Sequence, residues 1–599
     1  MKIIYTTLAF IFLSLSVFAQ NTPKGILIEA ESFNDKGGWL VDPQFVEQVG
    51  SPYLIAHGLG KPVSNASTNI TTPQKGKYHT WVRTKDWAPG DWEAPGRFQL
   101  MVNKKTVDAE LGTEKGWAWQ YIGEVRLKKG KNMLTLKDLT GFDGRCDAIY
   151  FSLANEAPPS EFEDLKNWRT SVLQLPESPE KEEAFDLVIT GGGLAGCASA
   201  IAAAEQGLKV ALIHDRPVLG GNASGEIRVH TLGIYGHFER ILKMLDTEHY
   251  PNGSPKAHQE DVKRLNNVQK YQNIHLYLNW RAFDAHAEDN TITHVDARQT
   301  NTGERKRFKA PLFVDCTGDG WIGYWAGAEF NYGRESVNEY GEEWEKHGEL
   351  WSPEEPDNFV MGSSVLWRSQ KADKSTTFPK VPWALEVAKE YAAANGEWQW
   401  EFSRNDLNQI DDAEHIRDHM LKAIYGSFYN EKQKAENDSL ELQWVSYLVG
   451  KRESRRLVGD HIFTMKDAKE QSRFPDSVVV EKRAIDVHYQ QNLLNSSEPD
   501  FLSEALFYRT DRYYVPYRSL YSKNIKNLFM AGRCFSCSHI GLGGPRVMRT
   551  TGQMGAAVGY AASICKKYGI EPRDVYNDHL DELMETILSS DELKPEVKQ

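Results

Sequence analysis

The chain has 599 residues, a formal net charge of −13 and a mean hydropathy of −0.54. Its length predicts two to four domains, at about 150 residues each. The excess of 83 acidic over 70 basic side chains argues against nucleic acid as a partner, because lysine and arginine provide the affinity for phosphate backbones. No internal apolar run approaches the roughly 20 residues that span a bilayer, so no transmembrane segment is expected in the mature chain.

The first residues have the pattern of a secretory signal peptide. Lys2 precedes the apolar stretch 3–15, which runs into the small-residue segment 16–20. This order is typical of an export signal, so residues 1–19 are a predicted signal peptide with cleavage after Ala19. Because the segment has no cysteine at the cleavage site and no twin arginine, we expect a periplasmic or secreted protein that crosses the membrane unfolded.

Residues 25–152 are predicted to form an all-β sandwich or jelly roll. Short runs of strand-forming residues alternate with polar turns at regular spacing, and helical periodicity is absent. The region resembles the carbohydrate-binding jelly rolls found beside sugar-active enzymes, and this resemblance implies a glycan-binding module. The segments that carry the resemblance are 29–31, 78–83, 102–103, 130–132 and 147–149.

Tryptophan is abundant, with seventeen copies, and six of them lie in this β region. Aromatic rings stack on sugars but also fill β cores, so both interpretations stay open. Trp87 and Trp92 flank the turn 88–91, and this position makes them the better candidates for a surface role. The next segment, 153–183, is rich in proline and glutamate and is predicted to be a linker with one short helix.

A dinucleotide-binding pattern begins after the linker. The apolar strand 185–190 runs into Gly191, Gly193 and Gly196, which are followed by a helix rich in small residues and a second strand, 208–213. The first glycine allows a tight turn, the second a close approach to a pyrophosphate, and the third close packing of helix on strand. We expect the phosphates to lie at the N-terminus of the helix.

The end of the second strand departs from this pattern. An acidic residue is expected there to bind a ribose hydroxyl, but the chain has His214. We therefore assign the ribose contact to Asp215, the next residue.

Three later segments, 216–224, 313–320 and 527–533, favour FAD over NAD. Together with 452–456 and 546–557 they resemble the FAD-dependent oxidoreductases that have a glutathione-reductase-like FAD domain, relatives of fumarate reductases and of heterodisulfide reductase A. The resemblance spans about residues 184–575.

The resemblance implies an α/β fold in which an α+β substrate domain interrupts a Rossmann-like FAD-binding domain. The FAD-binding domain is expected in two parts, 184–335 and 451–575, with the substrate domain at 336–450 and a C-terminal tail at 576–599. The residues that the resemblance implies at the cofactor are Gly191, Gly193, Gly196, Asp215, Gly220, Gly221, Asn222, Thr317, Gly318, Gly532, Arg533 and Gly552.

The cysteine spacing does not support an iron–sulfur cluster, although some relatives of heterodisulfide reductase carry one. The chain has six cysteines, and its only close pair is Cys534 and Cys537. A cluster commonly needs three cysteines in one tight run. The pair is interpreted as two small buried residues, as a redox disulfide or as an incidental bridge.

The substrate side is predicted from chemistry. Oxidation of an alcohol by FAD needs a base within hydrogen-bond reach of the hydroxyl. His539 is the first candidate for this base and His230 the second. Arg546 is a candidate for binding a carboxylate or for stabilising negative charge on the flavin.

We expect an exported oxidoreductase that oxidises a hydroxyl of a carbohydrate or glycoside and passes electrons to an unknown acceptor. The alternatives are a C=C reductase of the fumarate-reductase type acting on a carboxylate, and a non-catalytic glycan-binding protein with an inactive flavin domain.

Overall fold

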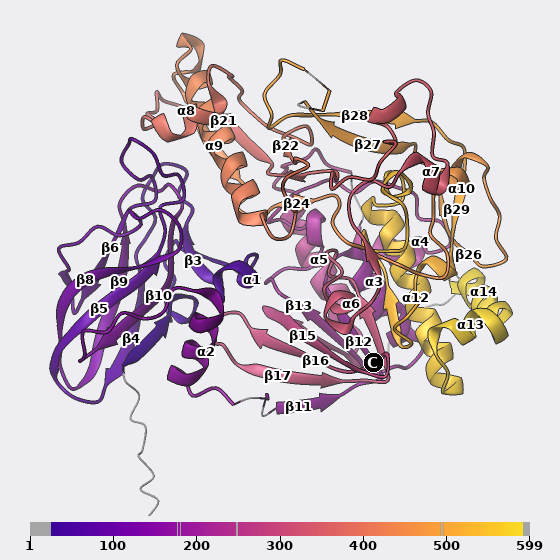
Figure 1. Cartoon of the computed structure of the whole chain (residues 1–599), viewed down its shortest axis with the longest axis horizontal. Coiled ribbons are helices and arrows are strands. Elements are labelled where there is room, and N and C mark those ends of the chain that lie inside the picture. The colour runs from indigo at the N-terminus through magenta and orange to yellow at the C-terminus, as the bar shows by residue number, and fades with distance from the viewer. Residues whose placement is uncertain are drawn as a thin grey trace, which may run out of the picture.

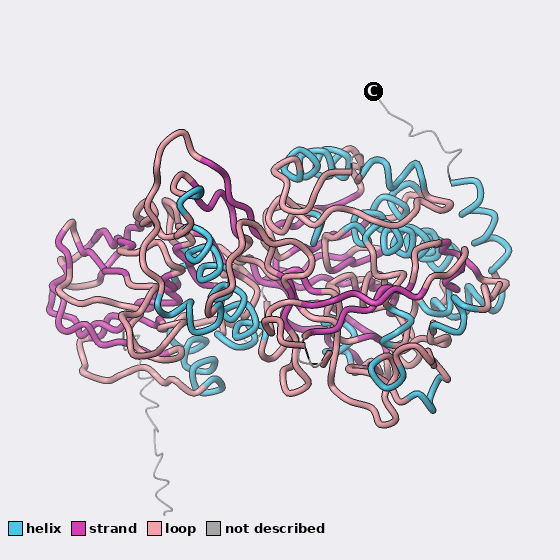
Figure 2. Tube along the Cα trace, turned by 90° about the horizontal axis from the view of Figure 1, so that it is seen from above, coloured by secondary structure: helices cyan, strands magenta, loops and turns pink. Residues whose placement is uncertain are grey.

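The computed structural model describes residues 25–590 apart from 177, 180, 247, 248, 492 and 495. The predicted signal peptide lies outside these residues, as does the end of the predicted tail. The described chain forms a β domain beside a larger α/β body (Figure 1). Seen from above, the two lie next to each other along the long axis (Figure 2).

The N-terminal domain is a sandwich of two antiparallel sheets. Apolar side chains alternate along strands such as Phe98–Val102, and they meet between the sheets in a core that includes Phe98, Leu100 and Leu134. The first sheet has the order β2 (Leu40–Asp42), β3 (Tyr53–Ala56), β10 (Gly144–Ser152), β5 (Gly76–Thr84) and β8 (Ala118–Leu127), and β1 (Ile26–Glu29) also pairs with β10. The second has the order β4 (Ala66–Thr72), β9 (Gly130–Asp138), β6 (Phe98–Val102) and β7 (Lys105–Thr106).

The predicted surface role of Trp87 is wrong. This side chain is only 3% exposed, because the inserted domain of the α/β body covers the loop that carries it. Its Nε1 donates a hydrogen bond to the carbonyl of Phe142, and its ring packs edge-on against Trp383 at 5.0 Å. Trp92 is half-buried and packs against the same cluster.

The α/β body is built on a five-stranded parallel sheet. Its order is β14 (Ile274–Leu278), β13 (Val210–His214), β12 (Leu187–Thr190), β18 (Leu312–Asp315) and β30 (Leu528–Met530). One face is covered by α3 (Leu194–Glu205) and α12 (Met548–Tyr568), and these helices pack closely because Gly555 faces the backbone of Ala195. The other face is covered by a second sheet of β11 (Lys181–Ala184), β17 (Arg305–Lys309), β16 (Thr291–Gln299) and β15 (Trp280–Glu288).

A long insertion separates β18 from β30 in the sequence. It contains the pairs β26 (Ser477–Glu481) with β29 (Tyr513–Pro516) and β27 (Ile485–Gln490) with β28 (Ser503–Tyr508), so it reaches past the predicted limit of residue 450. Its other strands are β19 (Phe330–Asn331), β20 (Ser363–Ser364), β21 (Trp367–Lys371), β22 (Glu401–Phe402), β23 (Leu440–Val445), β24 (Gly450–Lys451) and β25 (Arg456–Leu457). Its longest helix, α9 (Ala413–Lys432), packs with α8 (Pro382–Ala388) beside the sandwich (Figure 1).

The remaining helices are short. They are α1 (Val46–Val49), α2 (Phe162–Val172), α4 (Glu239–Leu245), α5 (Ala257–Gln269), α6 (Trp321–Ala326), α7 (Val337–Tyr340), α10 (Met465–Lys469), α11 (His539–Leu542), α13 (Pro572–Asp578) and α14 (Leu580–Ser589). Within the described part of the chain, no helix has the length and apolar character needed to cross a membrane. The predicted fold class, an α/β fold with an inserted domain and a preceding β-sandwich, is confirmed.

Candidate functional site

A cavity of about 500 Å³ lies at the carboxyl ends of the parallel strands. Ligands of open parallel sheets bind at this edge, where the connecting loops diverge. The predicted cofactor and catalytic residues that line the cavity are Gly191, Gly193, Asp215, Gly220, Gly221, Asn222, His230, Thr317, Gly318, Gly532, Arg533 and Arg546. Gly196, Gly552 and His539 do not line it.

The glycine turn after β12 forms a cradle that fits a pyrophosphate. Gly191 has φ +108°, and a Cβ there would lie 2.1 Å from the carbonyl oxygen of Cys316. A Cβ on Gly196 would lie 1.8 Å from the oxygen of Gly191, whereas at Gly193 the nearest atom would be 3.9 Å away. Gly193 caps α3 without a side-chain hydrogen bond, so the first N–H groups of this helix stay available to an anion.

His214 lines the cavity and supports this turn. Its Nδ1 accepts a hydrogen bond from the N–H of Gly192 at 3.0 Å, and its Nε2 donates to the carbonyl of Val218 at 2.9 Å. Burial lowers the pKa of His214 to about 4, which keeps the ring neutral and suits this pair of bonds. The acidic residue at this end of the sheet is Asp215, which lines the cavity.

Two cations stand beside the glycine cradle. Nζ of Lys451 and Nη2 of Arg533 lie 2.7 Å and 2.8 Å from the carboxylate of Asp319. Burial opposes ionisation of Asp319, but the two cations outweigh it and hold its pKa below the usual range. Gly318 has φ +81°, and a Cβ there would lie 2.5 Å from the guanidinium of Arg533. This glycine therefore lets Arg533 reach the cavity.

Gly552 acts through packing. A Cβ on this residue of α12 would lie 2.5 Å from the terminal methyl of Leu242 on α4, so a larger residue would force that side chain to move. The amino end of α12, including Met548 and Thr551, lines the cavity.

One part of the cavity lining, here called the reaction end, is rich in charge. Arg452, Arg483 and Arg546 line it together with Asp486 and His488. Within the described part of the chain, the Nε atoms of Arg483 and Arg546 have no hydrogen-bond partner. Burial lowers the pKa of Arg546 to about 10, although the neighbouring Asp486 opposes this shift.

His488 forms a hydrogen-bonded pair with Glu401 at the reaction end. Its Nδ1 lies 2.7 Å from Oε2 of Glu401, and its Nε2 lies 3.2 Å from Oδ1 of Asp486. Burial would raise the pKa of Glu401, but Arg452 and His488 outweigh it and lower the pKa to about 2. An ionised carboxylate accepts hydrogen bonds only, so Nδ1 donates to Glu401, while Nε2 faces Asp486 and the cavity.

His230 lies in the same cavity. Its Nδ1 has no hydrogen-bond partner among the described residues, and its ring lies 4.9 Å from that of His249. Burial, together with His249, Arg483 and Arg549, lowers the pKa of His230 to about 4. This imidazole is therefore neutral near pH 7.

The structure places His539 outside the cavity lining. The side chain is 1% exposed, and its Nδ1 lies 2.9 Å from Oε2 of Glu453. Its backbone N–H donates to Glu335 at 2.8 Å. The first candidate for the base is thus held in a buried polar cluster beside α11.

Sequence reasoning missed Glu401, Arg452, Arg483, Asp486 and His488. Arg452 lies in the segment 452–456 that carries the family resemblance, but no local signal marks the His488–Glu401 pair, because it joins residues 87 positions apart. It also missed Gln44, Phe45, Glu47 and Gln48, which line the cavity from the N-terminal sandwich.

Cys534 and Cys537 are free and buried. Burial raises the pKa of both thiols well above its ordinary value, which disfavours the reactive thiolate. Among the described residues, no group of three or more histidine, cysteine, aspartate or glutamate side chains is arranged to hold a metal ion.

The residues of the cavity fit FAD. The glycine cradle and its two cations suit a pyrophosphate, Asp215 suits a ribose hydroxyl, and the amino end of α12 and the polar groups of the reaction end line the same cavity.

Comparison with known proteins agrees with this fit. A family model described as FAD dependent oxidoreductase matches residues 186–587. No curated protein matches the chain.

Among solved structures, the chain is similar to quinol fumarate reductase from E. coli, with 12% identity over 68% of this chain and 75% of that chain and a TM-score of 0.26. A geranylgeranyl bacteriochlorophyll reductase-like protein from Thermoplasma acidophilum has 12% identity over 68% of this chain and 84% of its own, with a TM-score of 0.29. A family 35 carbohydrate binding module from Clostridium thermocellum has 16% identity over 21% of this chain and 96% of its own, with a TM-score of 0.18.

Proposed function

The chain belongs to the FAD dependent oxidoreductase family, and from this premise we propose that it oxidises a hydroxyl of a carbohydrate or glycoside. The observation that carries the proposal is the His488–Glu401 pair at the reaction end, where Nδ1 and Oε2 are 2.7 Å apart. FAD, when bound, supplies the acceptor for a hydride.

The proposed role of His488 is that of the general base. As the substrate carbon gives up its hydride, Nε2 of His488 takes the proton of the hydroxyl, and a carbonyl product forms. Glu401 orients the ring and stabilises the imidazolium, as the carboxylate does in other histidine–carboxylate pairs. Asp486, whose Oδ1 lies 3.2 Å from Nε2, adds to this stabilisation. His230 is the second candidate for the base.

Two aromatic side chains support a sugar as the substrate. Trp398 is 40% exposed and Phe507 is 50% exposed, and both line the cavity. Large apolar faces left open at a binding site suit the C–H faces of a pyranose ring.

The arginines favour a second candidate function. Arg452, Arg483 and Arg546 meet in one cavity, and two of them have an Nε without a partner among the described residues. This arrangement suits a carboxylate, as the reduction of a C=C bond in an unsaturated acid would require. Arg546 would then hold the carboxylate or supply the proton.

An anaerobic screen tests both functions. The purified yellow protein is mixed with glycosides, and bleaching of the flavin absorbance is followed; the reduced protein is then mixed with unsaturated carboxylates. We expect bleaching by glycosides, and a rate about 10² to 10⁴ lower in H488A. The matched control is H415A, which removes an exposed histidine of α9.

Two results would contradict the proposal. One is bleaching by a glycoside at the wild-type rate in H488A, which removes His488 as the base. The other is reoxidation by an unsaturated carboxylate without bleaching by any glycoside, which favours the reductase.

We propose that the protein acts in the periplasm or outside the cell. The predicted signal at residues 1–19 supports this location, and FAD must then be loaded after export. Mass spectrometry of the exported protein should find Gln20 as its first residue, and an intact Met1 would contradict export through this signal.

A further inference from the structure

We propose that the N-terminal sandwich is a built-in part of the FAD site, in which α1 and the preceding loop close the cavity over the adenosine half of the cofactor. The inference concerns retention of FAD and holds whichever substrate is oxidised. In Figure 1, α1 projects from the sandwich toward the α/β body.

The sandwich is linked through Arg281 to Asp215, the acidic residue predicted to bind a ribose. Nη1 of Arg281 lies 3.3 Å from Oδ2 of Asp215, and Nη2 of the same guanidinium lies 2.6 Å from Oε2 of Glu47 on α1. Glu47 therefore positions Arg281, and through it Asp215. All three side chains line the cavity. A residue of the sandwich thus shapes the nucleoside end of the site.

Two amides fasten the same segment to the cavity wall. Gln44 accepts a hydrogen bond from the N–H of Val449 at 2.9 Å and donates one to the carbonyl of Tyr447 at 3.1 Å. Gln48 donates to the carbonyl of Ile410 at 2.8 Å. Because Val449 and Ile410 also line the cavity, the loop and α1 form part of the cavity wall together with these residues of the α/β body.

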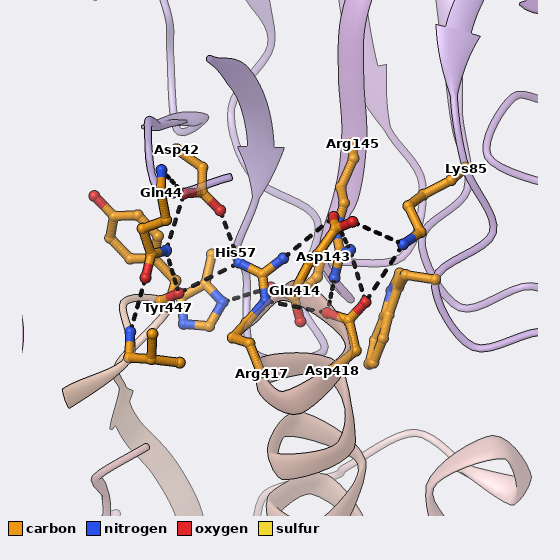
Figure 3. Close-up of polar contacts among 12 residues, drawn as sticks. Asp42, Gln44, His57, Lys85, Asp143, Arg145, Glu414, Arg417, Asp418 and Tyr447 are labelled. Carbon is orange, nitrogen blue, oxygen red and sulfur yellow. Dashed lines mark hydrogen bonds and ion pairs between the residues drawn. The ribbon is translucent and has the colours of Figure 1, made fainter. Parts of the chain in front are cut away.

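Behind this wall, a buried ion network joins the sandwich to α9 (Figure 3). Nη1 of Arg145 lies 2.8 Å from Glu414 and 2.9 Å from Asp418, and Arg145 is fully buried. From the other side, Nη1 of Arg417 lies 2.7 Å from Asp42 of the sandwich.

Lys85 completes the network. Its Nζ lies 3.0 Å from Glu414, so that three cations face three carboxylates across the interface. Separation of the domains would break all of these ion pairs together. The network therefore holds the sandwich against α9.

The loop end of the sandwich is also sealed by apolar contacts. Phe142 packs against Trp383 at 5.2 Å, and Trp87 packs against the same ring. A glycan could reach these aromatic side chains only by displacing the inserted domain. The loops that first suggested sugar binding instead hold the domain in the position from which α1 meets the cavity.

The test uses the full chain stripped of FAD. Affinities for FAD and for ADP, which carries the adenosine and the pyrophosphate but no flavin, are measured by calorimetry for the wild type and for E47Q. We expect both affinities to fall about tenfold in E47Q while the melting temperature of the apoprotein stays unchanged. The matched control is E124Q, which removes an exposed ion pair with Lys77 on the same sandwich and should bind both ligands as the wild type does.

Hydrogen exchange gives a second measurement that needs no variant. Addition of FAD should slow exchange in residues 43–50 and leave the strand 118–127 unchanged. Wild-type affinity of E47Q for both ligands, or exchange at 43–50 that FAD does not slow, would overturn the inference.

Discussion

Two of the histidine–carboxylate pairs in the α/β body, His488 with Glu401 and His539 with Glu453, have different surroundings and therefore different roles. His488 lines the cavity and Glu401 is buried behind it, whereas His539 and Glu453 are both buried outside the lining. Glu453 also accepts a hydrogen bond from the N–H of Met361 and pairs with Arg456, so the second pair ties several segments together.

We expect H539A to lower stability rather than chemistry. Loss of the ring leaves Glu453 short of a partner in a buried site, which costs about 2–4 kcal/mol. The rate of flavin reduction should stay within about threefold of the wild type, because the side chain does not line the cavity. Stopped-flow reduction and thermal melting measure the two quantities, and a 100-fold slower reduction in a stable H539A protein would restore His539 as the base.

Glu342 gives the protein a pH-dependent stability. Burial raises its pKa to about 7. The folded state therefore holds this proton more tightly than the unfolded state, and stability is full below about pH 4.5 and falls as the pH rises through 7. The contribution is up to about 3 kcal/mol, and it should be absent in E342Q because glutamine mimics the protonated acid.

Melting temperatures of the apoprotein between pH 5 and pH 8 check this prediction. The wild type should lose stability across this range, and E342Q should lose less. Parallel pH profiles of the two proteins would show that Glu342 does not titrate in the range.

At the scale of elements, two glycines in the turn from β12 into α3 have different roles: Gly196 allows close packing, and Gly193 faces the cavity. A Cβ on Gly196 would lie 1.8 Å from the oxygen of Gly191, so G196A should destabilise the fold by 1–3 kcal/mol or more. At Gly193 the nearest atom to a Cβ would be 3.9 Å away, so G193A should fold normally. The added methyl would then occupy space that faces the pyrophosphate.

FAD titration and thermal melting of the two variants test this contrast. We expect G193A to melt like the wild type and to bind FAD at least tenfold more weakly, and G196A to melt earlier. Unchanged FAD affinity in G193A would remove the pyrophosphate from this turn.

The local pattern of strand, glycine motif and helix made this element predictable, because neighbouring residues determine a tight turn and a helix start. The end of the insertion was not predictable in the same way. Strands β26 to β29 pair with one another and not with the parallel sheet. Nothing in their own composition shows which of these two kinds of pairing they adopt.

At the scale of the whole molecule, the interface between the sandwich and α9 should decide whether the chain unfolds as one unit. R145M leaves Glu414 and Asp418 facing each other without the buried arginine, which should cost about 3–5 kcal/mol. The variant should unfold in urea in two steps, with the sandwich separating first, whereas the wild type unfolds in one.

The control for this variant is R97A, which removes exposed ion pairs with Glu93 and Glu110 and should behave as the wild type. A single transition in R145M at the wild-type midpoint would show that the network does not hold the domains together.

The sequence by itself determined the β domain, the dinucleotide turn and the family, because each depends on patterns within a few tens of residues. It also carries the predicted export signal. Only the tertiary structure placed His488 at the cavity and His539 outside its lining, and brought a sandwich resembling a glycan-binding module against the nucleoside end of the site. The decisive contacts, His488 with Glu401 and Arg281 with Glu47, join residues 87 and 234 positions apart, and such pairs depend on how whole elements pack rather than on neighbouring residues.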